Sequence, residues 1–290
     1  RQPLEGSSQI SPKVDTMAIN RTLFAKPIAF LKRDFKIAAS YRLQFVIQSF
    51  NIFLTTFSFF LVSKMFDKQH ITLLEPYGGD YFSFVLIGIA LTDYLTVSTD
   101  TFATEMRNAQ IVGTLEALIV TPTSINTILF SSFVYKLLSS SLRTLFYFLL
   151  GIFIFGVKLQ DINVFLLLLT FLLTLLPFVG LGLLSAAFII VFKQGSPVSM
   201  VMAISSGLLS GVLYPVAVLP SWLKPVSVML PVTHGLEAIR QILLQGATFT
   251  EIDTRLYCLF IFSISFMAIG IYAINKALQV ASREGSLLHY

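Results

Sequence analysis

Residues 207–244 form an apolar stretch that cannot be a single membrane-spanning helix. Four prolines interrupt it at nearly regular intervals, namely Pro215, Pro220, Pro225 and Pro231. Each proline removes a backbone hydrogen-bond donor and kinks or ends a helix. At membrane depth, such broken backbone is tolerated only where it is buried in protein or lines a cavity. The stretch is therefore predicted to be a structure built at one membrane face and held there by the rest of the chain.

The composition of the remaining chain indicates an integral membrane protein. Of the 290 residues, 55% are hydrophobic and 12% are charged, whereas soluble domains average about 25% charged residues. A helix needs about 20 apolar residues to cross a bilayer, and the sequence predicts six such spans. They are residues 43–63, 81–103, 130–157, 162–192, 198–214 and 256–275. The expected fold class is therefore all-α, and no room remains for a soluble catalytic domain.

The sequence outside the spans divides into three parts. Residues 1–16 are polar and are predicted to be disordered. Residues 17–40 alternate apolar and basic positions with a helical period, which is typical of a helix lying in the membrane interface. The alternative is a solvated lead-in to the first span. The transmembrane domain is expected to cover residues 17–283, followed by a cytoplasmic tail at 284–290.

The distribution of Lys and Arg predicts that both termini lie in the cytoplasm. Cytoplasmic loops of membrane proteins are enriched in these residues. With the N-terminus inside, the inner loops hold twice as many of them as the outer loops. The proline-broken stretch then reaches the outer face.

Two acidic residues in the second span match two basic residues in the third. Asp93 and Asp100 are seven residues apart, as are Lys136 and Arg143, so each pair shares one helix face. Depth counted from the inner loop matches Asp100 with Lys136 and Asp93 with Arg143. Ionisable groups within spans are costly and usually pair or face water, so two ion pairs are predicted. In the alternative, both basic side chains reach inward to water and the acids face a wet cavity.

The fifth span carries a stripe of small residues at Ala203, Gly207 and Gly211. Such stripes allow two helix backbones to approach closely. Packing within the subunit and contact between subunits both remain open.

A short helix is predicted at the outer rim, beginning at a cap on Thr233 and ending at Gly246. On it, Glu237 and Arg240 are three residues apart and are expected to pair. His234 is interpreted as a structural residue. Trp222, the only tryptophan, is expected to anchor at the membrane interface.

The inner loop at residues 104–126 contains an apolar helical face, which Thr121 and Pro122 end. This face is expected to pack either on the membrane interface or on a partner protein. The sequence has no HExxH motif, no cysteine cluster and no GxxxxGK[ST] motif. No catalytic or metal-binding residue is therefore predicted, and any ATP that the protein uses must be bound by another chain.

Two segments resemble the ABC-2 type permeases, which are the membrane subunits of ATP-binding-cassette exporters of the type-2 class. GTLEALIVTP, at residues 113–122, follows the second span. SGVLYPVAVLPSWLKPVSVMLPVTHGLEAIR, at residues 210–240, follows the fifth. The resemblance covers about residues 18–282, with six spans behind an amphipathic helix. One departure is His234, which stands where the family often has tyrosine or another aromatic residue.

The resemblance implies a role for each segment. The first would be a coupling helix that docks on a separate ATP-binding subunit, with a smaller second contact at residues 193–197. The second would form re-entrant half-helices that close the outer end of the pathway. The implied coupling residues are Gly113, Thr114, Leu115, Glu116, Leu118, Thr121 and Pro122. The implied outer-gate residues are Gly211, Tyr214, Pro215, Leu219, Pro220 and Trp222.

The function implied is that of the permease of an ATP-driven exporter for a hydrophobic or amphiphilic substrate, such as a lipid, a lipid-linked glycan or a drug. Expected partners are two ATP-binding subunits that hold ATP and Mg²⁺, a second permease copy in a homodimer, and membrane lipids, but no nucleic acid. A bacterial inner membrane is the expected location. A secondary transporter or channel without an ATPase is one alternative. A membrane-embedded lipid transferase is another, but it needs a nucleophile, base or metal set that the sequence lacks.

Overall fold

The computed structural model describes residues 32–33, 35–36, 40–66, 72–111, 125–193 and 195–284. Within these ranges every regular element is a helix and no strand occurs. The predicted disordered segment, nearly all of the predicted interfacial helix and all seven implied coupling residues lie outside them.

Five of the described helices are long and apolar enough to cross a membrane. They are α2 (Arg42–Phe66), α3 (Tyr81–Ile111), α5 (Ile125–Leu149, continued by a π-helical turn at Leu150–Ile154), α6 (Val164–Phe192) and α10 (Phe249–Glu284). The shorter elements are α7 (Pro197–Leu209), α8 (Lys224–Val228), α9 (Pro231–Gln245) and two 3₁₀ helices (Thr72–Tyr77 and Val216–Val218). The multi-pass, all-α fold class is thus confirmed.

The fifth predicted span, at residues 198–214, is not a full crossing in this structure. α7 has 13 residues, which gives about 20 Å at 1.5 Å per residue, against about 30 Å of hydrocarbon core. It begins behind the Ser196 cap with Pro197 in its first turn. It stops at Leu209 because Gly211 takes a φ of 81°, a left-handed conformation that ends a helix and that glycine adopts without strain. The helix therefore ends before the first proline of the broken stretch.

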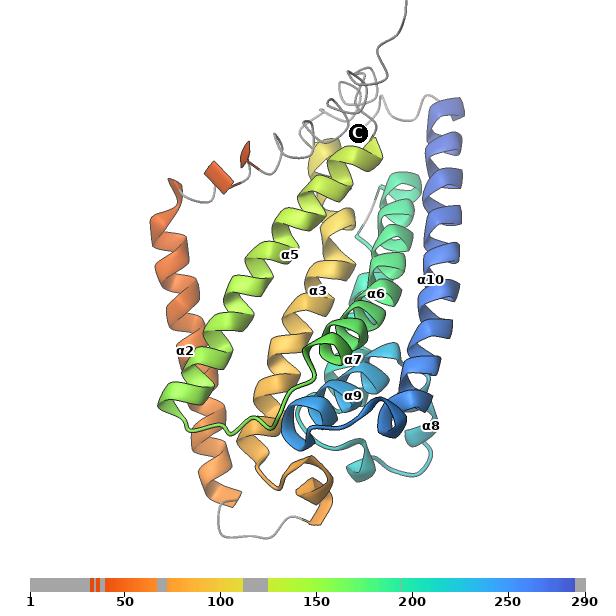
Figure 1. The fold of residues 1–290 in the computed structure, drawn as a ribbon. Helices are drawn as coiled ribbons and strands as arrows, with labels where there is room; N and C mark the ends of the chain where they lie inside the picture. Colours follow the sequence, from red (N-terminus) through yellow and green to blue (C-terminus); the bar gives the residue numbers. More distant parts are fainter. Residues whose placement is uncertain are drawn as a thin grey trace, which may run out of the picture.

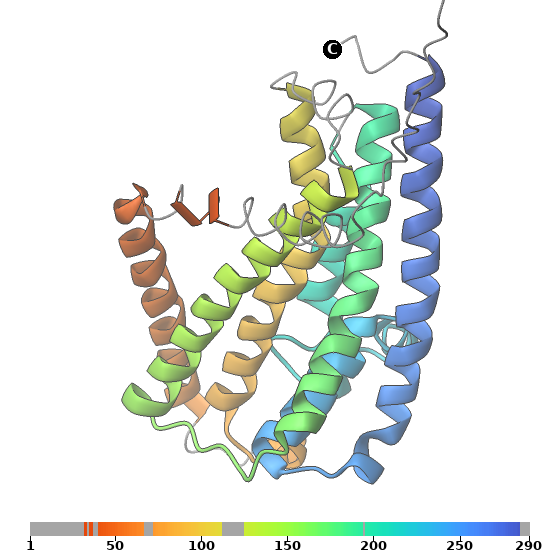
Figure 2. The ribbon, with the colours of Figure 1, turned by 45° about the horizontal axis from the view of Figure 1, so that its top comes forward.

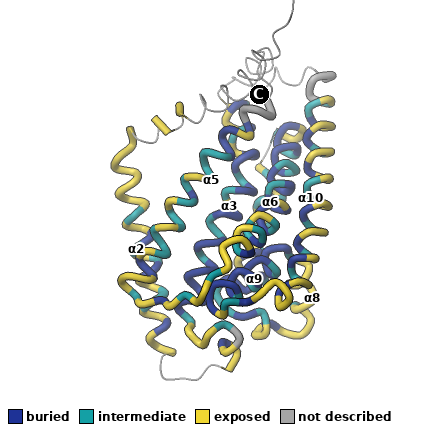
Figure 3. Tube along the Cα trace, in the orientation of Figure 1, coloured by how far each residue is buried: buried dark blue, intermediate teal, exposed yellow. Residues whose placement is uncertain are grey.

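The core of the bundle is centred on α3. α6 packs against α3 on one side and α10 on the other, while α9 packs across α3, α6 and α10 at one end. We call this end, lower in Figure 1, the α9 end; it also holds α8 and the loop between α5 and α6. In Figure 3, α3 and α9 are the most deeply buried helices, whereas α2 is largely exposed.

α2 is fastened to the bundle only towards the α9 end. There Phe60 packs on Phe82 and Phe155, with ring centroids 5.5 and 4.6 Å apart. In the other half, residues 41–48 are all exposed. Figures 1 and 2 both show α2 diverging from α3 and α5 towards the opposite end. The first seven residues of this apolar helix, 42–48, therefore pack on no other described part of the chain.

α6 and α10 touch through their backbones at two glycines. A Cβ atom added at Gly180 would lie 2.3 Å from the carbonyl oxygen of Phe266, and one at Gly270 would lie 2.3 Å from that of Gly180. Since both obstacles are backbone atoms, neither can rotate away. Only glycine permits this approach, as in other closely packed membrane helices.

Replacing Gly270 with alanine is expected to push α10 away from α6 and to destabilise the protein by about 1–3 kcal/mol. The midpoint of thermal unfolding in detergent measures this change. Gly207→Ala is the matched control, because a Cβ atom at Gly207 meets nothing within 4 Å, and its effect should stay within about 0.5 kcal/mol. Equal midpoints for the two variants would contradict the backbone contact.

Candidate functional site

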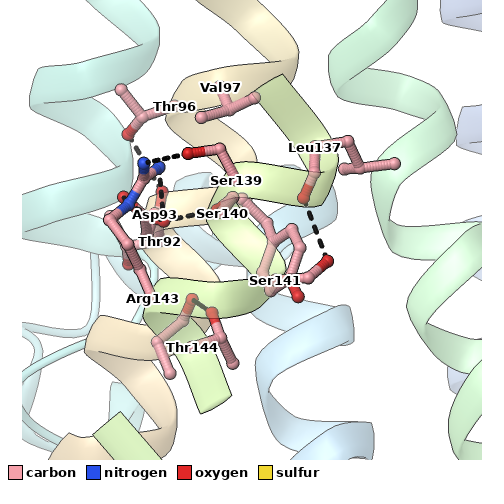
Figure 4. A network of polar contacts seen from close by, with 12 residues as sticks. Thr92, Asp93, Thr96, Val97, Leu137, Ser139, Ser140, Ser141, Arg143 and Thr144 are labelled. Carbon is pink, nitrogen blue, oxygen red and sulfur yellow. Dashed lines mark hydrogen bonds and ion pairs between the residues drawn. The ribbon is translucent and has the colours of Figure 1, made fainter. Parts of the chain in front are cut away.

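Asp93 and Arg143 form an ion pair between α3 and α5, as predicted. Asp93 Oδ2 lies 2.8 Å from Arg143 Nη2, and Arg143 Nε donates to both carboxylate oxygens at 3.0 and 3.2 Å. The hydroxyl group of Ser140 also donates to Asp93, and Arg143 Nη1 lies 3.4 Å from the hydroxyl oxygen of Ser139 (Figure 4). The two residues can pair because they are equally many residues from the helix ends at Ile111 and Ile125, which places them at matching depth on antiparallel helices. Two nitrogens of one guanidinium on one carboxylate form a strong, oriented contact.

The second predicted ion pair is wrong. Lys136 Nζ lies 3.0 Å from Glu105 Oε1, not next to Asp100. Asp100 and Lys136 are equally many residues from the helix ends at Ile111 and Ile125, so their depths do match. The long lysine stem nevertheless directs the ammonium group towards the membrane surface, where Glu105 is more than one helical turn closer to the end of α3.

A line of polar side chains continues from this ion pair along α3. Its members begin with two adjacent residues and then recur every three to four residues, so that they lie on one broad face of the helix, where they are half-buried or exposed. We call this line, together with Ser139 and Arg143 of α5, the polar track. Its α3 members are Thr92, Asp93, Thr96, Asp100 and Thr104. Polar and ionisable groups inside a membrane normally face water or another protein surface rather than lipid.

The proline-broken stretch is a chain of short elements, as its prolines predict. Ser227 donates its hydroxyl to the carbonyl of Leu209 at 2.5 Å, and the hydroxyl of Tyr214 donates to the carbonyl of Leu208. Pro215 and Leu219 are buried, whereas Trp222 is 73% exposed. The stretch is thus folded back onto the end of α7. Whether these residues act as a gate remains a prediction.

Arg240 is not a rim residue, and its predicted pairing with Glu237 is wrong. Its side chain is 1% exposed. The guanidinium group donates to three backbone carbonyls, those of Phe84 at 3.1 Å, Gly211 at 2.8 Å and Val212 at 2.9 Å. Its central carbon lies 3.4 Å from the centre of the Phe84 ring. One buried cation thus joins α9, α3 and the chain that leaves α7.

The space around Arg240 leaves no room for a larger neighbour. A Cβ atom at Gly88 would lie 2.7 Å from Arg240 Nη2 and 2.4 Å from the carbonyl oxygen of Val212. The sequence carried a signal for this burial. Arg240 follows Leu236 by four residues and precedes Leu243 by three, so it lies on the apolar face of its helix.

Glu237 instead pairs with Arg255 of α10, with Oε2 and Nη2 2.9 Å apart. Arg255 also donates to Gln241 Oε1 at 2.5 Å. Burial raises the pKa of Tyr77, and the nearby carboxylate of Glu237 raises it further. This cluster links the 3₁₀ helix before α3 to α9 and α10 at the α9 end.

α9 begins earlier than predicted and is not a surface helix. Its cap is Leu230, with Pro231 in the first turn, because proline suits the start of a helix. Thr233 instead donates its hydroxyl to the carbonyl of Ser227 at 2.7 Å. His234 Nε2 lies 2.8 Å from the carbonyl oxygen of Val228, a contact consistent with a structural role. The predicted end at Gly246 is confirmed, with a φ of 65°.

The predicted stripe of small residues divides in two. Ala203 and Gly207 are exposed on α7, so they pack on no other helix that the structure describes. Gly211 lies outside the helix, in the turn that Arg240 holds. The stripe therefore does not mediate close packing within the described part of the subunit.

The part of the chain that the structure describes contains no group of three His, Cys, Asp or Glu side chains placed to hold a metal ion. The sequence model of the ABC-2 type transporter family matches residues 28–244. This match includes both segments in which the resemblance was seen. A comparison with curated proteins finds no match.

Proposed function

Because this chain belongs to the ABC-2 type transporter family, we propose that it is the membrane-spanning permease subunit of an ATP-driven exporter. The observation that carries the proposal is the family match over residues 28–244, which spans four of the five long helices and the proline-broken stretch. The protein is a multi-pass integral membrane protein. Export, the identity of its partners and a bacterial inner membrane are parts of the proposal.

The substrate pathway runs along the polar track. The track gives an apolar bundle one hydrophilic face that includes a fixed ion pair. Such a face is unfavourable against lipid and favourable against water or the polar part of a substrate. A hydrophobic or amphiphilic substrate, such as a lipid, a lipid-linked glycan or a drug, would expose its polar part to this face.

A second copy of the permease closes the pathway. The support is that the polar track is only partly buried, while residues 42–48 of α2 and Ala203 and Gly207 of α7 are exposed in the described part of one chain. A homodimer covers such surfaces with a self-complementary interface. The residues between α7 and α9, held by Arg240, then close the outer end of the pathway.

Two separate ATP-binding subunits supply the energy and hold ATP and Mg²⁺. They dock on residues 113–122, whose sequence resembles the coupling helix of the family. ATP binding draws the two subunits together, and the docked segments tilt the spans so that the pathway opens. Such a switch requires that the partners bind the two permease conformations with different affinity.

The proposal is tested by copurification of the chain with candidate ATP-binding subunits, followed by ATPase measurements in bilayers that contain lipid or drug candidates. A stable complex whose ATPase rate responds to one class of amphiphile is the expected result. Substrate flux by the chain alone, driven by an ion gradient, would instead identify a secondary transporter or channel.

Replacing Glu116 with lysine in the complex is expected to reduce transport at least about tenfold, through loss of about 1.4 kcal/mol of coupling between the subunits. ATP hydrolysis should continue, and the unfolding temperature of the permease should not change. Leu115→Asp should act in the same way. The control is Lys224→Glu, a charge change on α8, which lies at the α9 end of the bundle. Normal transport by the Glu116 and Leu115 variants would place the docking site elsewhere.

A further inference from the structure

An apolar cavity lies between α5 and α6, and a face of α5 other than the one that carries the polar track contributes to its wall. Its volume is about 330 Å³, and helices α3, α5, α6 and α9 all contribute to its wall. Thr144 lines the cavity, whereas its neighbour Arg143 belongs to the track. Successive residues on a helix point about 100° apart, so the two sites use different faces of α5.

The wall of this cavity offers few hydrogen-bonding groups to a water molecule. Besides apolar side chains it contains the hydroxyl groups of Tyr94 and Thr144. The hydroxyl of Thr144 is already directed to the carbonyl of Ala90, at 3.4 Å, and the ring of Tyr94 packs edge-on against Phe171, with centroids 4.7 Å apart. An ordered water needs two to four polar partners. The cavity is therefore suited to an apolar molecule rather than to water.

The cavity is accessible from the surrounding membrane. Leu168, on its rim, is 55% exposed, and Leu145, on the neighbouring outer surface of α5, is 54% exposed. α5 packs on α3 and α2 but makes few contacts with α6. α5 and α6, which flank the opening, thus face lipid and make few contacts with each other.

One end of the cavity is closed by the loop between α5 and α6. Leu159 of this loop lines the cavity, and the backbone of Gln160 donates to the carbonyl of Leu243 at 3.0 Å, which holds the loop onto α9. Lys158, next to Leu159, is exposed. A cationic side chain therefore stands at the membrane surface beside an apolar cavity.

We propose that this cavity binds one acyl chain of a membrane phospholipid whose phosphate group lies at Lys158. The volume lies at the lower end of the range for ligand sites, about 300–1,000 Å³, which suits one hydrocarbon chain rather than a whole amphiphile. The bound chain fills the space between α5 and α6 and stabilises the folded bundle, because a ligand that binds only the native state raises its stability. The site goes beyond the proposed export function and is independent of it.

The test uses the full chain in detergent micelles with phosphatidylglycerol that carries a photoreactive diazirine in the middle of one acyl chain. After irradiation, labelling is expected to concentrate on the peptides that contain Phe148 and Phe171. Leu168→Trp, which obstructs the rim from the lipid side, should reduce this labelling about tenfold. Leu172→Trp is the matched control, since Leu172 is 56% exposed on the same helix but does not line the cavity. Uniform labelling of exposed positions on α2, α5 and α6, or equal labelling of both variants, would overturn the proposal.

A second measurement separates the acyl chain from the phosphate group. Phosphatidylglycerol should raise the unfolding temperature of the unmodified chain and of Leu172→Trp, but not that of Leu168→Trp. Lys158→Glu should weaken the apparent affinity for phosphatidylglycerol about tenfold and leave the response to diacylglycerol with the same chains unchanged. Lys224→Glu should alter neither response. An unchanged phosphatidylglycerol affinity in Lys158→Glu would contradict the phosphate contact.

Discussion

Arg240→Met is expected to destabilise the protein by about 3–5 kcal/mol, the range for a buried ionic group whose partners lose it. The substitution keeps most of the side-chain volume but removes the donors to the carbonyls of Phe84, Gly211 and Val212. These carbonyls are buried between α3, α9 and the end of α7, where water does not replace the lost donors. Since whole domains are stable by only about 5–15 kcal/mol, this loss removes a large fraction of the free energy of unfolding. The yield of monodisperse protein and its unfolding midpoint measure the effect.

Two further variants isolate the role of the planar guanidinium group. Arg240→Lys keeps the positive charge but offers a compact ammonium group that cannot reach three carbonyls in a fork, so its stability should fall between those of Arg240→Met and the unmodified chain. Arg255→Met removes an arginine of the same end of the bundle whose side chain is 27% exposed, and should change stability by about 0–1 kcal/mol. If Arg240→Met were no less stable than Arg255→Met, the three carbonyl contacts would not hold this region together.

Exchanging the charges of Asp93 and Arg143 together is expected to restore what each single exchange removes. Asp93→Arg places two cations in contact within the bundle, and Arg143→Asp places two acids there. Each single variant should lose about 2–3 kcal/mol, since an uncompensated charge within a span has about this cost. The double variant regains an ion pair between the same helices. Unfolding midpoints of the four proteins, arranged as a double-mutant cycle, give the coupling energy.

The ion pair of Lys136 and Glu105 provides the comparison. Its side chains are 32% and 28% exposed, and the lysine stem reaches towards the membrane surface. The corresponding exchange should therefore change stability by only about 0–1 kcal/mol. If the Asp93 and Arg143 double variant were as unstable as the worse single variant, the two residues would act separately rather than as a pair.

Features that depend on local pattern and depth could be predicted from the sequence. Five spans followed from runs of apolar residues, and the end of α9 followed from Gly246. The contact between Asp93 and Arg143 followed from equal spacing on two consecutive antiparallel helices. Long apolar runs and loop-linked helices leave few geometric alternatives, so such features need no knowledge of the remaining fold.

Errors arose where a residue had a choice of partners. Depth predicts Asp100 as the partner of Lys136, but the length of the lysine side chain favours Glu105. Glu237 and Arg240 are neighbours on one helix, yet each bonds to another part of the chain. On an exposed helix, Glu237 and Arg240 would have had only each other as bonding partners. α9 is buried, so the groups packed around it determined both contacts.

By itself the sequence determined that this chain crosses a membrane, that residues 207–244 cannot do so as one helix, and which family the chain resembles. Only the tertiary structure decided how the broken stretch is held. α7 ends at Leu209, and Arg240 binds the two residues that follow Ser210 while its ring contact is Phe84, far away in the sequence. The physical reason is that prolines and apolar runs determine only the local structure of the segment that contains them. A buried cation is placed by carbonyl groups that only the packing of α3, α7 and α9 brings together.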